Sequence, residues 1–194
     1  AQAACSVECT GGHIDVRSFL ARCSAVIVAS GGEAVVGTAN SEFGTTIRAD
    51  NVTLDNSAAT GLTMEARGGD INGTGIIVSD SFVNFDAARN ITFGSISAAS
   101  TFTLDVAGNI TFDAVSTIDG NVQLTAGEAI EAGSINTADV ATNVGGNDAI
   151  VLVAGTTLNL VTAQAQDSIS ITADSLDAGT LVSDLNAINV STAQ

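Results

Sequence analysis

The sequence predicts an all-β fold, a parallel β-helix (β-solenoid) of about nine rungs with about 20 residues each. Three observations support this fold: a composition suited to strands and tight turns, apolar residues that alternate with period two, and one short pattern that recurs along the chain. Val, Ile, Thr and Phe on a background of Gly, Ala, Ser, Asn and Asp are typical of strands and turns. The chain has only 5 Lys and Arg residues and no Pro, Trp or Tyr. This is a poor composition for long amphipathic helices.

The repeat is clearest between residues 102 and 115. Its apolar residues form two alternating groups separated by a turn: Phe102, Leu104, Val106, then Ile110, Phe112, Val115. Equivalent positions recur about 20 residues earlier and later, so their side chains are expected to stack in columns inside a tube. One predicted column contains Val83, Phe102, Val122, Ile150, Ile169 and Ile188. At about 4.8 Å per rung, the rod is on the order of 45 Å long.

The repeat also sets the expected boundaries. An antiparallel sandwich gives short strands too, but it does not require one pattern at a fixed period. Residues 1–25 fit the repeat poorly and are predicted to form an N-terminal cap or linking segment, with the solenoid over 26–194. The first complete copy is expected to turn Val26 and Val28 inward. The step from Val122 to Ile150 is longer than the others and predicts a loop insertion at about 137–148.

Three cysteines lie near the start of the chain, at Cys5, Cys9 and Cys23. Their clustering in an otherwise cysteine-free chain predicts one disulfide and one thiol that is free or bonded to another subunit. Together with His13 they also resemble a zinc ligand set, but the spacing lacks the Cys-x-x-Cys knuckle of such sites. The sequence does not decide which two cysteines pair.

The net charge is −16, and none of the five arginines lies beyond Arg89. Such a surface repels phosphate backbones, which argues against nucleic-acid binding. No apolar run reaches the length of a membrane span, so membrane insertion is not expected. The acidic surface suits a secreted or cell-surface protein, and the small residues of the Ala-Gln-Ala-Ala start are typical of a signal-peptidase product.

No catalytic residues and no metal ligands are predicted. His13 has no Ser/Asp or Cys partner at a recognisable spacing, and lyase-type chemistry would need a Lys or Arg base or paired carboxylates in one groove. Asp86 and Asp105 occupy equivalent outward positions on neighbouring rungs; they either share a calcium ion or form part of a solvated acidic face. Outward Thr92 and Thr111 raise the possibility of ice binding, but no regular threonine array continues from them.

Five asparagines begin Asn-x-Ser/Thr sequons, which are possible glycosylation sites. They are Asn51, Asn72, Asn90, Asn109 and Asn189. Asn90 and Asn109 are also equivalent turn positions, where asparagine tolerates left-handed backbone geometry and forms a ladder. The ladder is the preferred interpretation of these two.

The ends of a solenoid expose strand edges. The final segment fits the start of another rung, and together with the first complete copy it gives the candidates for contacts between subunits. These are Ala187, Ile188, Asn189, Val190 and Ser191 at one end, and Val26 and Val28 at the other.

Residues 121–135, 101–115 and 150–160 resemble the repeats of filamentous-haemagglutinin-type exoproteins and related bacterial surface adhesins. This resemblance, over about residues 25–190, implies an extracellular β-helix that forms part of a long adhesive rod. The chain departs from that family in its short length, its cysteine-bearing start and the absence of a clear match to the secretion module.

These observations predict a non-enzymatic extracellular structural protein. Its expected partners are copies of itself, joined head to tail through the solenoid ends into a surface filament. The alternative is a monomeric adhesin or carbohydrate-binding module whose partners are cell-surface glycans. No cofactor is expected, apart from the calcium ion considered above.

Overall fold

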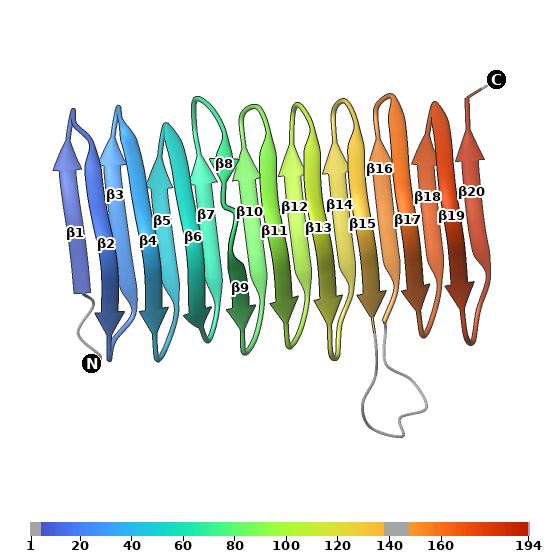
Figure 1. Ribbon diagram of the computed structural model, residues 1–194, viewed down its shortest axis with the longest axis horizontal. Helices are drawn as coiled ribbons and strands as arrows, with labels where there is room; N and C mark the ends of the chain where they lie inside the picture. Colours follow the sequence, from blue (N-terminus) through green and yellow to red (C-terminus); the bar gives the residue numbers. More distant parts are fainter. Residues whose placement is uncertain (1–4, 138–147, 194) are drawn as a thin grey trace.

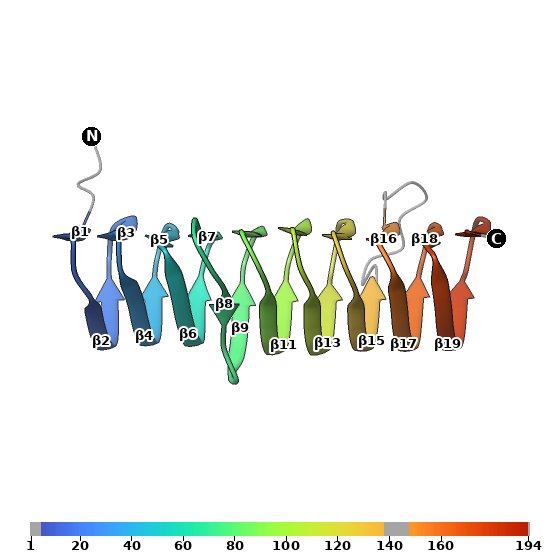
Figure 2. The same cartoon turned by 90° about the horizontal axis from the view of Figure 1, so that it is seen from above.

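The computed structural model describes residues 5–137 and 148–193, which form a parallel β-solenoid of two facing sheets (Figures 1 and 2). The flat sheet contains, in spatial order, β1 (Cys5–Thr10), β3 (Ala25–Ser30), β5 (Thr45–Ala49), β7 (Leu62–Ala66), β10 (Val83–Ala87), β12 (Phe102–Val106), β14 (Val122–Ala126), β16 (Ile150–Ala154), β18 (Ile169–Ala173) and β20 (Ile188–Thr192). The predicted fold class is confirmed.

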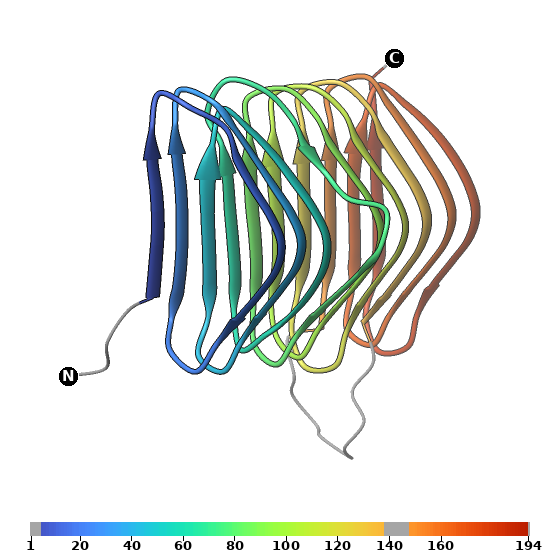
Figure 3. The ribbon, with the colours of Figure 1, turned by 60° about the vertical axis from the view of Figure 1, so that its left-hand side comes forward.

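The second sheet is bent, as Figure 3 shows. It contains β2 (Ile14–Ala21), β4 (Glu33–Ser41), β6 (Asn51–Ala59), β8 (Ile71–Asn72) with β9 (Ile76–Ser79), β11 (Ile91–Ala98), β13 (Ile110–Thr117), β15 (Ile130–Thr137), β17 (Thr157–Ala165) and β19 (Ser175–Ser183). In β11, Gly94 and Ser95 are both partly exposed between buried Phe93 and Ile96. This break in the alternation is where the strand bends, so each rung has three sides.

The predicted columns are confirmed by the strand register. Val83 pairs with Phe102, Phe102 with Val122, and Val122 with Ile150. All four side chains are at most 1% exposed. No single rung can bury its apolar face, and stacking supplies the core. The inserted loop lies between β15 and β16, and most of its predicted span, 138–147, is outside the described residues.

Two expectations about the N-terminal part are wrong. Val26 and Val28 face outward, while Ile27 is fully buried and pairs with buried Ile47. Residues 25–29 are apolar throughout, so the alternation had no visible phase, and a one-residue slip exchanges the two faces of a strand. The solenoid also begins before residue 26, because β1 and β2 form a complete first rung that pairs with β3 and β4.

The cysteines hold this first rung. Cys5 and Cys23 form a disulfide with a Cα–Cα distance of 6.2 Å, which joins the start of β1 to the corner after β2. Because both thiols are consumed, the zinc set with His13 is excluded. Cys9 is free and half-buried. It pairs in register with Ala29, so it continues the inward column of small residues.

A column of hydroxyls at the corner after the bent sheet was not anticipated. The hydroxyl groups of Ser79, Thr117 and Ser183 each donate to the carbonyl oxygen three residues later, at 2.8–2.9 Å. Each one closes the turn that returns the chain to the flat sheet. The sequence signal is a Ser or Thr that recurs at the inward position two residues after the last apolar residue of the repeat, as in Val115 and Thr117.

Candidate functional site

The two ends of the described solenoid present the same columns that are buried along its length. Val7 in β1 and Val190 in β20 occupy the column of Ile27, Leu104 and Leu152. Those interior members are at most 1% exposed, whereas Val190 is 47% exposed. Each end therefore offers apolar side chains and one unpaired edge of the flat sheet to a further strand.

The predicted contact residues fall on the two ends unequally. Ile188, Asn189, Val190 and Ser191 lie in β20, the last described strand, where all four are exposed. Ala187 lies just before that strand. Val26 and Val28 lie in β3, whose two edges are already paired with β1 and β5. The residues at the opposite edge are those of β1, which lie within the predicted cap or linking segment.

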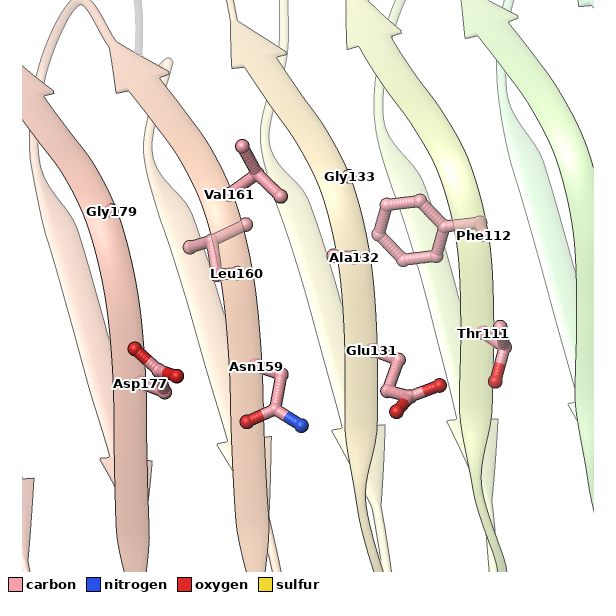
Figure 4. Close-up of a pocket in the computed structure, with 10 residues that line it drawn as sticks. All are labelled: Thr111, Phe112, Glu131, Ala132, Gly133, Asn159, Leu160, Val161, Asp177 and Gly179. Atoms are coloured by element: carbon pink, nitrogen blue, oxygen red, sulfur yellow. The ribbon is translucent and has the colours of Figure 1, made fainter.

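A groove runs over the bent sheet near its bend (Figure 4). One part has a volume of about 470 Å³ and combines an apolar wall with a polar row. Phe112, Leu160 and Val161 make the wall. The polar row contains Thr111, Glu131, Asn159 and Asp177, which are register neighbours on four successive rungs. Such a row offers a hydrogen-bonding group at every strand spacing, about 4.8 Å apart.

Small residues create the hollow. Ala132 stands between Phe112 and Leu160 in the register, and Gly133 follows it at the bend. A Cβ atom on Gly133 would clash with the carbonyl oxygen of Asp113, so only glycine fits this approach of two rungs. A second part of the groove shares Thr111 and Glu131 and continues toward Asn90 and Asn109. An extended chain rich in hydroxyl groups is the ligand that this geometry suits.

No family model, curated protein or solved structure matches this chain.

Three of the predicted sequons belong to a ladder at the corner before the bent sheet. The Oδ1 atom of Asn51 accepts from the Asp70 N–H at 3.1 Å, and Asp70 accepts from the Asn90 N–H at 3.0 Å. Asn90 in turn accepts from the Asn109 N–H at 2.9 Å. The ladder ends where Asn109 accepts from the Ala129 N–H. The asparagine ladder expected at Asn90 and Asn109 is therefore present, and Asn72 and Asn189 are exposed.

Replacing Asn90 with alanine should lower the free energy of unfolding by about 1–3 kcal/mol, because a partly buried N–H of Asn109 loses its acceptor. Urea unfolding measures the loss. Asn72→Ala is the matched control, because its side chain is exposed in β8 and the change should stay within about 0.5 kcal/mol. Equal losses in the two variants would show that the ladder adds no stability.

The flat sheet carries the acidic residues considered for calcium. Asp86 and Asp105 are register neighbours, and Glu65 precedes them. Arg67 and Arg48 contact Glu65 at 2.9 and 3.0 Å. The hydrogen bond from Arg67 is the main cause that lowers the pKa of Glu65. Among residues 5–137 and 148–193, no three His, Cys, Asp or Glu side chains are grouped to hold a metal ion.

His13 lies at the first corner, where its Nδ1 is 3.4 Å from a carboxylate oxygen of Glu33. Both side chains are about half exposed, so the pair is a surface contact of small energetic weight. The described ranges also contain no helix long and apolar enough to cross a membrane.

Proposed function

We propose that this protein is a non-enzymatic structural subunit that joins copies of itself head to tail into an extracellular filament. The observation that carries the proposal is the exposure, at both described ends, of columns that are buried everywhere between them. Joining two copies through the flat sheet would bury these side chains and pair the free edges of that sheet, β20 of one copy with β1 of the next. Because the two contacting surfaces differ, each junction leaves a free surface at both ends. Stacking continues along the axis of the rod, so the copies do not close into a ring and the assembly is open.

The columns define the register of this junction. Continuing each column from β20 to β1 of the next copy places Ile188 beside Cys5, Val190 beside Val7, and Asn189 beside Ser6. The junction lies in the flat sheet, because β20 extends that sheet past β19. In the bent sheet, a gap the width of one strand remains between β19 of one copy and β2 of the next.

The predicted register can be tested with two cysteine variants, Ser6→Cys and Asn189→Cys, each in a Cys9→Ser background. Both positions face outward, and neighbouring parallel strands bring Cα atoms within disulfide range. The mixture should form disulfide-linked dimers on a non-reducing gel, whereas each variant alone should not. In the control mixture, Ser191→Cys takes the place of Asn189→Cys. Residue 191 is out of register with residue 6, so this mixture should not form the dimer.

Electron microscopy of the wild-type protein should show filaments. A protein that sediments as a monomer at high concentration and forms no cross-link in the mixture would overturn head-to-tail assembly.

Several properties support an extracellular location. Disulfides such as Cys5–Cys23 are typical of oxidising compartments. The acidic surface and the resemblance to surface-adhesin repeats agree with secretion to the cell surface. We propose that no cofactor is needed and that calcium, if it binds, does so at Asp86 and Asp105.

The groove favours a second candidate function, a carbohydrate-binding adhesin module. Its polar row and apolar wall match the hydroxyl edge and the hydrocarbon face of a sugar chain. Titration with neutral linear oligosaccharides tests this function, and Asn159→Ala should weaken any binding. A monomer that binds these ligands would favour the module over the filament subunit.

A further inference from the structure

Among residues 5–137 and 148–193, one side of the solenoid carries no charged residue. Beyond the bend, every strand of the bent sheet turns two side chains outward, from Ser18 and Leu20 in β2 to Thr180 and Val182 in β19. The charge-free face consists of these outward positions in β2, β4, β6, β9, β11, β13, β15, β17 and β19. None of them is Asp, Glu, Lys, Arg or His. The chain has 21 acidic residues, so this face is an exception on a strongly acidic molecule.

Charges occupy the other two sides and the borders of this face. Asp86 and Asp105 point outward from the flat sheet, and Glu131 and Asp177 lie before the bend. Asp113 lies at the bend itself and is exposed. A charge-depleted surface with a charged rim is typical of protein–protein interfaces.

The side chains of the charge-free face allow close approach. Ser95 and Ser97 in β11 and Ala114 and Ser116 in β13 are short, so a second sheet can pack against them without large gaps. Aliphatic residues lie among them, including Leu20 at 81% and Val78 at 40% exposure. Burial of these side chains adds an apolar contribution to the contact.

We propose that the charge-free face binds the same face of a second copy of this chain, side by side. Two molecules with a net charge of −16 repel each other, and this repulsion is weakest where no charges meet. Nine strands with about four residues each give roughly 550 Å² per copy. About 1,100 Å² in total is at the lower limit of a specific interface, so a single pair is weak.

Within the proposed filament, and resting on that function, the faces of successive subunits line up into one stripe. Two filaments then meet at many weak contacts at once, which multiplies the affinity. Filaments are therefore expected to associate laterally into bundles.

The test separates side-by-side pairing from head-to-tail assembly. Val190→Asp, at an exposed position of β20, places a charge in the end junction and leaves the charge-free face intact. In this background, sedimentation should show a monomer–dimer equilibrium. High salt should strengthen it, because screening reduces the repulsion between the acidic molecules.

A charge pair placed on the face should remove the dimer. Ser97→Glu with Ser116→Glu should weaken dimerisation by more than about tenfold, because unpaired charges become buried. Thr92→Glu with Thr111→Glu adds the same charge on the same strands before the bend and should leave dimerisation nearly unchanged. A monomer at every salt concentration, or equal weakening in both pairs, would overturn the proposal. If the Val190→Asp protein dimerises but the wild type forms no filaments, side-by-side pairing stands and only head-to-tail assembly is contradicted.

Discussion

Replacing Phe85 with alanine should lower the free energy of unfolding by about 3–5 kcal/mol. The Phe85 side chain is fully buried, and its ring centre is 5.1 Å from that of Phe93 and 6.5 Å from that of Phe102. The three rings join the two sheets across the interior. Rungs on both sides hold the backbone in register, so the cavity has little room to collapse.

Urea and thermal unfolding measure this loss, and Phe82→Ala is the matched control. The Phe82 side chain is 46% exposed, so its removal should cost about 1 kcal/mol or less. A similar loss for both variants would show that ring burial does not determine the stability of this region.

Opening the disulfide, by replacing Cys5 and Cys23 with serine, should lower the free energy of unfolding by about 3 kcal/mol. The two cysteines are 18 positions apart in the sequence, and closing a loop of this length restricts the unfolded chain by about that amount. The effect should be local, since each rung of a solenoid contacts only its neighbours. Hydrogen exchange should therefore accelerate in β1 and β2 first, with little change in the central rungs.

Cys9→Ser is the control, because Cys9 is not part of the disulfide. This variant should keep the exchange protection of the wild type in β1 and β2. Undiminished protection in the serine pair as well would mean that strand pairing alone holds the first rung.

The sequence was sufficient to predict the fold and the columns of the central rungs. There, polar residues alternate strictly with apolar ones, as in Phe102–Val106, so only one register buries the apolar set. At residues 25–29 both faces are apolar, and the register is set by pairing with β5, which a single strand does not show. The first rung was missed because Cys5 and Cys9 stand where aliphatic residues stand elsewhere.

The candidate surfaces depend more strongly on three-dimensional information. The groove requires the bend, which brings small residues such as Ala132 between large ones on neighbouring rungs. The charge-free face combines residues about 20 positions apart, and it is recognisable only once their register is known. The pairing of Cys5 with Cys23 likewise depends on the corner that places them one strand apart. By contrast, the Asn90–Asn109 ladder was visible as a repeated turn residue.

The identical register of successive rungs has a consequence for evolution. Val83 pairs with Phe102 as Phe102 pairs with Val122, so a rung such as 102–121 could be duplicated or deleted in the gene without disturbing the columns on either side. Each such event would change the length of the rod by about 4.8 Å and leave both ends intact. The number of rungs would then set the distance between the two ends, and so the distance between any partners bound there.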